Sequence, residues 1–399
     1  MTLNQTPSAN RLHIGFYGKR NAGKSSLINA FTGQEVSIVS EVAGTTTDPV
    51  NKAMEIHDIG PCVLIDTAGF DDIGELGEIR VKKTQEVAEK TDIAVILFSG
   101  EDFTLETRWY NFFVNKKVPV LPVVSKADLY INGSAYALRV ESKVGAKPVL
   151  VSATGKKGIK ELKEAIIRLI PNDFDSPSIT GDLCKENDTV LLVMPQDIQA
   201  PKGRLILPQV QTIRELLDKK VSVVCSTTDT FISTLSTLKN EPDLIITDSQ
   251  AFDFVYKNKP ENCPLTSFSV LFAGYKGDIN YYTQSAKHLD TLTNDSWVLI
   301  AECCTHAPLS EDIGRVKIPA ILRKRVGENI KIEMVSGADF PQDLSQYDLV
   351  IQCGGCMFNR KHILNRINRC KEQNVPITNY GIAMAHFTGI LENIVIPNN

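Results

Sequence analysis

Two groups of residues in this chain have types and spacings that are suited to chemistry. Near the start, Gly18 to Ser25 reads GKRNAGKS and matches the pattern G-x-x-x-x-G-K-S/T between a β-like run and a helical pattern. Near the other end, Cys304-Thr-His306 and Cys353-Gly-Gly-Cys356 offer three thiols and an imidazole. The first pattern is typical of phosphate binding and the second of metal binding, so we expect one site to regulate the other.

The phosphate-binding loop is the most specific signal. Its glycines let backbone amides approach phosphate oxygens, Lys24 reaches the β- and γ-phosphates, and the Ser25 hydroxyl ligates Mg²⁺. The predicted contacts are Gly18, Asn21, Ala22, Gly23, Lys24, Ser25 and Ser26.

Two further loops fit the reacting phosphate. Gly44-Thr-Thr-Thr-Asp48 lies where a first switch is expected, and Thr46 is the candidate that completes the Mg²⁺ shell. Asp66-Thr-Ala-Gly69 follows an apolar run, so Asp66 is expected to hold a magnesium-bound water and the Gly69 amide to contact the γ-phosphate. Lys24, Thr46, Asp66 and Gly69 are therefore the candidate catalytic residues.

Two later loops predict the base. Ser125-Lys-Ala-Asp128 is similar to the guanine-specificity pattern N-K-x-D, in which Lys126 and Asp128 bind the base and the carboxylate accepts hydrogen bonds that adenine cannot offer. Ser152-Ala153 is similar to the loop whose amide contacts guanine O6. Ser125 stands where Asn is usual, so we expect weaker affinity for GTP without a change of base.

In order and spacing these loops resemble the Era and TrmE class of GTPases over residues 10–170. The resemblance implies that Asn21 helps to bind K⁺ beside the phosphates, where the cation replaces the charge of an arginine finger. Phe70 stands where Ras-type proteins have a water-orienting Gln, so we expect hydrolysis to be slow.

The cysteines follow two predicted strands. Cys304 comes just after the run 297–301 and Cys353 ends the run 348–352, and the carboxyl ends of parallel strands meet at one sheet edge. Alternation along a continuing strand would send Cys303 to the opposite face from Cys304, and the C-x-H spacing selects Cys304. Spacing alone fits structural zinc and an iron–sulfur cluster equally well.

The elements that position these residues form an α/β protein with three domains. A P-loop GTPase with a doubly wound sheet is expected at 1–172, followed by two smaller parallel α/β domains at 180–264 and 265–399. Predicted strands are 14–17, 61–65, 93–98, 118–124, 189–193, 221–225, 243–247, 297–301, 330–335, 348–352 and 375–379. A helix is expected from about Met357, with its N-terminal amides toward the cysteines.

Composition and the N-terminal sequence indicate the compartment and the class of partner. The net charge of −4 gives no reason to expect nucleic acid as the main partner, and no apolar run is long enough for a membrane span. The N-terminus lacks the pattern of a secretory signal, and the nine cysteines are an odd number. We therefore expect a cytoplasmic protein with reduced thiols.

C-x-H, then 46 residues, then C-G-G-C, behind a GTPase domain and a motif-free middle domain, resembles the HydF family of iron-only hydrogenase maturation factors. The resemblance implies a 4Fe–4S cluster on Cys304, Cys353 and Cys356, and dimerisation through the middle domain. It also implies a scaffold that receives a diiron precursor as cargo from radical-SAM maturases and delivers it to the apo-hydrogenase.

The fourth cluster ligand stays open. The family commonly has His before C-G-G-C, where this chain has Gln352, whose carboxamide is a poor iron ligand. His306 either ligates the metal or is a hydrogen-bonded loop residue, and Glu302 or an exogenous group is an alternative ligand. The competing functions are an RNA-interacting GTPase, a zinc-regulated GTPase and a redox enzyme.

Overall fold

The computed structural model describes residues 7–34, 50–69, 83–171, 174, 178–195, 205–303, 313–337 and 339–398. The chain divides into two compact units, Met1–Asp175 and Ser176–Asn399, which are described separately. Among the described residues, no helix is long and apolar enough to cross a membrane.

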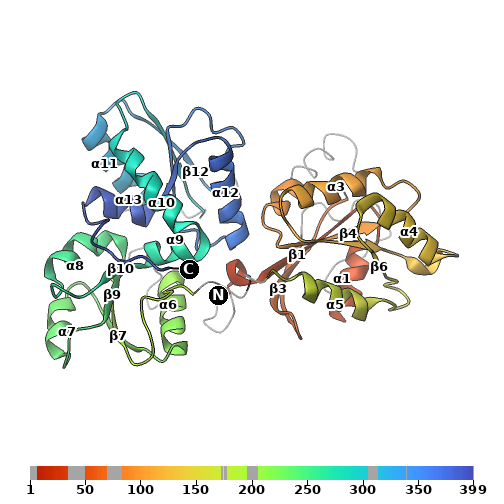
Figure 1. Cartoon of the computed structure of the whole chain (residues 1–399), viewed down its shortest axis with the longest axis horizontal. Helices are drawn as coiled ribbons and strands as arrows, with labels where there is room; N and C mark the ends of the chain where they lie inside the picture. The colour runs from red at the N-terminus through yellow and green to blue at the C-terminus, as the bar shows by residue number, and fades with distance from the viewer. Residues whose placement is uncertain are drawn as a thin grey trace. The chain divides into compact units, whose positions relative to one another are not determined.

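The first unit is built on one six-stranded sheet (Figure 1). Five of its strands are parallel, and β2 is an antiparallel edge strand beside β3. In the order β2-β3-β1-β4-β5-β6 the strands are Val50–Ile56, Gly60–Asp66, Leu12–Gly18, Ile93–Phe98, Val120–Val124 and Val149–Leu150.

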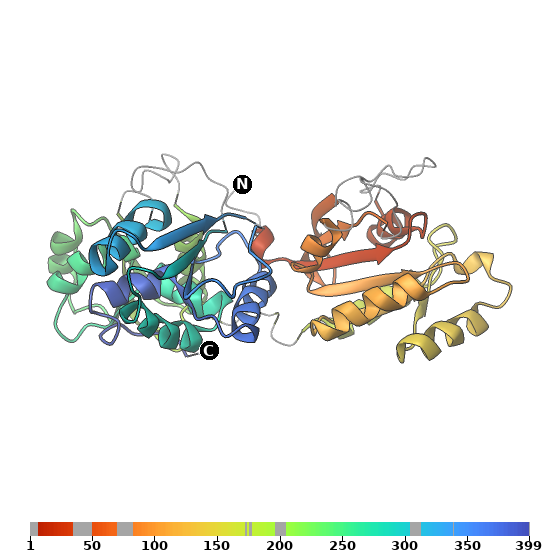
Figure 2. The ribbon, with the colours of Figure 1, turned by 90° about the horizontal axis from the view of Figure 1, so that it is seen from above.

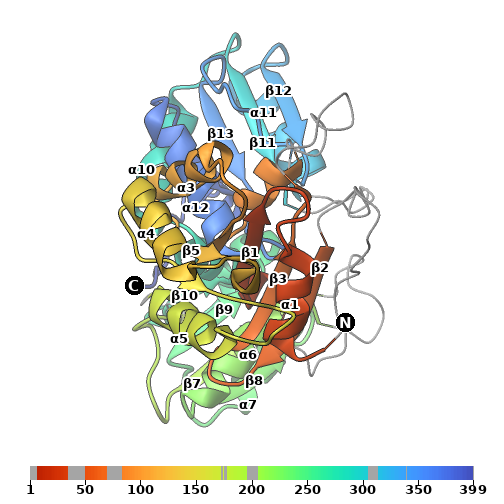
Figure 3. The same ribbon diagram turned by 90° about the vertical axis from the view of Figure 1, so that its right-hand side faces the viewer.

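Helices cover both faces of this sheet. Helices α1 (Lys24–Thr32) and α5 (Ile159–Leu169) pack on one face, and α3 (Thr104–Asn115) and α4 (Gly133–Val144) pack on the other (Figure 3). In α5 the buried residues Leu162, Ala165 and Ile166 recur at the spacing of one helical face. The unit is therefore the doubly wound sheet that the sequence predicts, with one antiparallel edge strand added.

The second unit contains two four-stranded parallel sheets, coloured green to blue in Figure 2. One has the order β10-β9-β7-β8, with strands Leu265–Ser267, Leu244–Thr247, Thr189–Val193 and Ser222–Ser226. The other has the order β12-β11-β13-β14, with strands Lys331–Val335, Trp297–Ala301, Leu349–Gln352 and Ile377–Asn379. The described helices of the second unit are α6 (Leu207–Asp218), α7 (Phe231–Thr237), α8 (Phe252–Asn258), α9 (Phe268–Lys276), α10 (Ile279–Ala286), α11 (Ile318–Val326), α12 (Arg360–Glu372) and α13 (Tyr380–Phe387).

These two sheets share a hydrophobic core. In β7, Leu191 and Val193 belong to a cluster that continues into the third sheet, whereas Val190 and Leu192 pack on the opposite face. Because both faces of β7 are covered, the strand reads as an unbroken apolar run. The α/β class with two further parallel sheets is thus confirmed.

Three short or edge strands, β2, β6 and β10, escaped prediction. The expected third segment starts at Leu265, but β10 pairs with β9, so the change of sheet falls after Ser267. Helix α12 begins at Arg360 and not near Met357, because Asn359 caps it by accepting a hydrogen bond from the His362 N–H at 3.2 Å.

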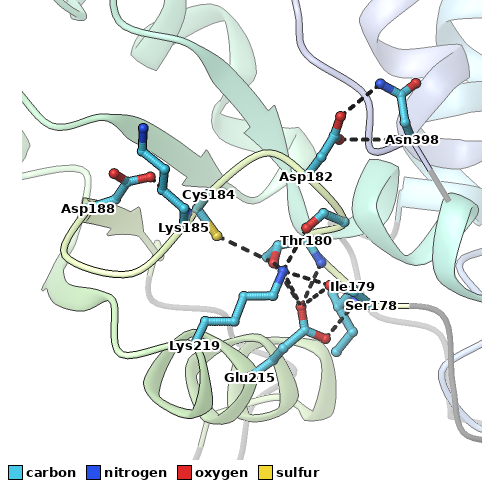
Figure 4. A network of polar contacts seen from close by, with 11 residues as sticks. Ser178, Ile179, Thr180, Asp182, Cys184, Lys185, Asp188, Glu215, Lys219 and Asn398 are labelled. Carbon is cyan, nitrogen blue, oxygen red and sulfur yellow. Dashed lines mark hydrogen bonds and ion pairs between the residues drawn. The ribbon is translucent and has the colours of Figure 1, made fainter.

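One carboxylate fixes the start of the second unit to α6 (Figure 4). Glu215 accepts hydrogen bonds from the backbone N–H groups of Ile179 at 2.6 Å and Thr180 at 2.9 Å, and from the Ser178 hydroxyl at 2.7 Å. Lys219 Nζ lies 3.5 Å from the same carboxylate and donates to the Gly181 carbonyl. Burial raises the pKa of Glu215, but these hydrogen bonds outweigh it and hold the pKa below its ordinary value of 4.5.

We expect Glu215→Gln to lower the free energy of unfolding of this unit by about 2 kcal/mol at neutral pH, because two backbone donors lose a charged acceptor. The pKa of Glu215 is lowered by folding, so this stabilisation is present above pH 4.5 and disappears as pH falls through the folded pKa. Urea unfolding of the full chain, followed by Trp297 fluorescence in a Trp109→Phe background, measures both effects. Asp218→Asn, which removes a solvent-exposed pair with Arg214, is the matched control, with an expected change below ~0.5 kcal/mol. An equal loss in both variants would contradict the assignment.

Candidate functional site

The phosphate-binding loop joins the end of β1 to the start of α1. Gly23 has φ +91°, a conformation that favours glycine, and a Cβ there would lie 3.7 Å from Lys126 Cε of the guanine-specificity loop. Lys24 is buried, and its Nζ donates to the carbonyls of Gly18 at 3.0 Å and Lys19 at 2.9 Å. The loop is therefore already wrapped around the amine that would face the phosphates.

A buried acid holds the outer side of this loop. Lys19 Nζ lies 3.1 Å from Glu106 Oε2 on α3, whose side chain is fully buried, and also donates to the Asp102 carbonyl. Burial raises the pKa of Glu106, and the ion pair with Lys19 opposes this rise. This ion pair could not be predicted from the sequence, because Lys19 occupies a variable position of the motif and Glu106 has the pattern of an ordinary helix residue.

The two residues predicted to bind magnesium and its water, Ser25 and Asp66, meet at the ends of two neighbouring elements. The Ser25 hydroxyl at the start of α1 donates to Asp66 Oδ2 at the end of β3, at 2.6 Å. The Thr67 hydroxyl donates to the Phe16 carbonyl at 2.6 Å and so fixes the strand end that carries Asp66. A hydroxyl and a carboxylate at this distance fit one hard cation such as Mg²⁺. Gly69 follows in the same loop, while Thr46 and Phe70 lie outside the described residues.

The two base-binding loops are joined to each other. The Ala127 N–H donates to the Val151 carbonyl at 2.9 Å, and a hydrogen bond with Ser152 lowers the pKa of Asp128. Ser152 Oγ also accepts from the Gly155 N–H at 3.0 Å, which orders the turn that contains Ala153. Ser125 is buried, and its hydroxyl donates to the Phe98 carbonyl at 3.4 Å. Asp128 is exposed, and its lowered pKa favours the carboxylate form that the predicted guanine contact needs.

The cysteine site forms where β11 and β13 end side by side. Ala301 pairs with Gln352, and the Cys353 N–H donates to the Ala301 carbonyl at 3.0 Å. The Cys303 N–H donates to Cys353 Sγ at 3.1 Å. A hydrogen bond with the Cys303 thiol lowers the pKa of Cys353, against burial and the nearby Cys356. The alternation that would separate Cys303 from Cys304 requires a continuing strand and does not apply here, because β11 ends at Ala301.

The C-G-G-C loop turns tightly between β13 and α12. Gly355 has φ +65°, and a Cβ there would lie 2.6 Å from Ile363 Cδ1 and 3.8 Å from Cys303 Sγ. The positive φ and the close approach to α12 therefore favour glycine at this position. Near the same loop, burial lowers the pKa of Lys276 to about 8, while the thiols of Cys356, Cys303 and Cys353 raise it.

Gln352 and the alternative ligand Glu302 both have partners away from the thiols. The buried Gln352 carboxamide donates through Nε2 to the Tyr282 hydroxyl at 3.0 Å, while its Oε1 has no hydrogen-bond partner among the described residues. Glu302 forms an ion pair with Arg315 at 2.9 Å and accepts from the Ser336 hydroxyl at 3.4 Å.

Cys304 and His306 lie in the segment 304–312, outside the described residues. Within the described part of the chain, no three His, Cys, Asp or Glu side chains are grouped to hold a metal ion.

Known GTPases are similar to the part of the chain that contains the phosphate-binding loop. Residues 13–126 match the family model described as a 50S ribosome-binding GTPase. Two similar proteins are the tRNA modification GTPase MnmE of Heliobacterium modesticaldum, 36% identical over 39% of this chain and 34% of that protein, and the GTPase Der of Wolinella succinogenes, 36% identical over 43% of this chain and 38% of that protein. The chain thus spans about a third of the length of the curated relatives it matches. A crystal structure of Era with MgGDPNP and ribosomal RNA is similar at a TM-score of 0.37 and 18% identity, covering 54% of this chain and 92% of that one.

Together, the loop geometry and these matches define a P-loop GTPase that hydrolyses GTP. Residues 179–277 match the hydrogen maturase F dimerization domain, and residues 280–397 match the hydrogen maturase F tetramerization domain. The chain belongs to the hydrogen maturase F family and is a hydrogenase-maturation GTPase. The sequence analysis expected dimerisation through the middle domain and did not anticipate a tetramerization domain at residues 280–397.

Proposed function

We propose that this chain is an iron–sulfur scaffold that carries a diiron precursor to the apo-hydrogenase, with its GTPase timing contact with partners. Cys304, Cys353 and Cys356 would hold a 4Fe–4S cluster whose fourth position takes exogenous ligands or cargo. The observation that carries the proposal is the pairing of β11 with β13, which brings the end of one cysteine segment against Cys353.

The surroundings of the thiols fit a negatively charged cluster. Two buried cations, Lys276 and Arg366, lie beside the cysteine loop. Glu302 is bound to Arg315 and Ser336, which supports a fourth position without this carboxylate. When bound, the cluster would supply the exchangeable iron site, and the chain's own residues would orient it and exclude water.

The proposed domains are 1–172 for GTP and Mg²⁺, 180–264 for dimerisation and 265–399 for the cluster. The proposed partners are radical-SAM maturases and the apo-hydrogenase, in the cytoplasm. Ordering of the switch loops by GTP and their release after hydrolysis would change these contacts.

An RNA-interacting GTPase is the second candidate, since the similar MnmE proteins are described as tRNA modification GTPases. That similarity covers under half of the chain, whereas the maturase models match the rest. A zinc-regulated GTPase is the third candidate, because three thiols also suit zinc.

The potassium role of Asn21 predicts a salt effect. We expect GTP hydrolysis to be about tenfold faster in K⁺ than in Na⁺ at equal ionic strength, equivalent to ~1.4 kcal/mol of transition-state stabilisation. Asn21→Ala should remove the difference. Asn115→Ala, at the exposed end of α3, is the control and should retain it. Equal rates in both salts for the unaltered chain would rule out the cation role.

Removal of a cluster thiol should separate the two activities. After anaerobic reconstitution with iron and sulfide, Cys304→Ser, Cys353→Ser and Cys356→Ser should each lose bound iron and the paramagnetic signal of the reduced cluster. Their GTP hydrolysis should stay within about twofold of the unaltered rate, because the nucleotide loop and the cysteines belong to separate compact units and, among the described residues, share no partner within either. Lys24→Ala should show the reverse.

Cys225→Ser is the matched control, since that thiol is exposed in the second sheet. Iron binding should be unaffected in this variant. Zinc without a paramagnetic signal in the unaltered protein would favour the zinc-regulated candidate, and loss of both activities in every variant would contradict a modular chain.

A further inference from the structure

The last residue of α9 is a buried lysine that holds the cysteine loop. Lys276 is 1% exposed, and its Nζ donates to the carbonyls of Phe358 at 2.7 Å, Gly355 at 3.2 Å and Cys356 at 3.3 Å. All three carbonyls belong to the turn between β13 and α12. One ammonium group therefore gathers the loop that carries Cys356 around itself.

A second buried cation lies on the other side of the thiols. Arg366 on α12 is 2% exposed, its Nη1 lies 3.7 Å from Cys303 Sγ, and its Nη2 donates to the Gly337 carbonyl. Its guanidinium stands over the rings of Phe340 at 4.8 Å and Phe358 at 5.2 Å. Cation–π contacts of this kind compensate only part of the cost of removing a charge from water.

Neither cation has an acidic partner in the part of the chain that the structure describes. Within the described residues, no carboxylate forms an ion pair with Lys276 or Arg366. Burial of an unpaired charge costs several kcal/mol, so such groups are retained where an anion compensates them. The groups that the two cations flank are the thiols of Cys303, Cys353 and Cys356.

We propose that Lys276 and Arg366 form the cationic lining of the cluster site, and that Lys276 is a positioning residue that holds the C-G-G-C loop ready to bind an anionic iron–sulfur cluster. The proposal rests on the cluster-scaffold function proposed above. Lys276 lies in the segment that matches the dimerization model, whereas its three acceptors lie in the segment that matches the tetramerization model. The cluster loop is thus held by a residue from outside its own sheet.

The first test uses the metal-free full chain. Loss of three hydrogen bonds of ~1 kcal/mol each in Lys276→Met should speed hydrogen exchange of the amides at 354–358 by at least about tenfold. Lys276→Arg, which keeps the charge and donors, should restore most of the protection. Lys371→Met is the matched control, because this lysine forms a partly exposed pair with Asp278 near the same helices, and it should leave the loop unchanged.

The second test uses the reconstituted full chain. Lys276→Met should bind several-fold less iron, and the cluster that it retains should have a lower reduction potential, because a nearby positive charge favours the more negative, reduced state. Arg366→Met should also lower the potential. Lys371→Met should change neither quantity.

Equal rates of loop hydrogen exchange in Lys276→Met and Lys371→Met would overturn the positioning role of Lys276. An unchanged reduction potential in Lys276→Met and Arg366→Met would overturn the cationic lining. If Lys276→Met does not fold, two other variants separate the effect of the charge from that of the hydrogen-bond donors: Lys276→Gln keeps donors without the charge, and Lys276→Arg keeps both. An unchanged reduction potential in the folded Lys276→Gln variant would overturn the proposal. If loop exchange responds as expected but the unaltered chain binds no iron, the scaffold function fails while the clamp on the loop stands.

Discussion

The parallel pairing of β11 with β13 is the constraint on which the proposed metal chemistry depends. Strand pairing fixes where both strands end, and a cysteine follows each strand within two residues, Cys303 after β11 and Cys353 after β13. The Cys303 amide and the Cys353 sulfur therefore come within hydrogen-bond distance although 50 residues separate them. The nucleotide site obeys the same rule, since the phosphate loop and Asp66 follow the carboxyl ends of β1 and β3.

Buried charge is organised differently at the two sites. At the phosphate loop, Lys19 is neutralised by Glu106, and Lys24 is held by carbonyls until phosphate oxygens are present. At the cysteine loop, Lys276 and Arg366 are held by carbonyls, aromatic rings and sulfur, with no carboxylate among the described residues. Both sites thus have buried cations next to the atoms that would bind an anionic ligand, which is a nucleotide at the first site and, in the proposed function, a thiolate-bound cluster at the second.

The sequence predicted what local patterns encode. Long apolar runs located the central strands, and the spacing of Gly18, Gly23, Lys24 and Ser25 located the loop that the structure places between β1 and α1. Strands β6 and β10 were too short to show a pattern, and the exposed β2 is an edge strand without an apolar run. Lys276, Glu106 and Arg366 were beyond prediction, because a charged residue becomes a buried partner only through tertiary contacts. The contact between Cys303 and Cys353 was also beyond prediction, because the alternation argument assumes a strand that continues past Ala301, where β11 ends.

The central claim is that sulfurs from the ends of β11 and β13 bind one iron cluster with an exchangeable fourth ligand. Iron-edge X-ray absorption of the anaerobically reconstituted full chain, with and without added imidazole, tests this directly. We expect each iron to have mainly sulfur neighbours and a short iron–iron distance. We also expect a minority light-atom ligand that changes when imidazole is added. Isolated iron without an iron neighbour, or a complete sulfur shell that imidazole does not alter, would contradict it.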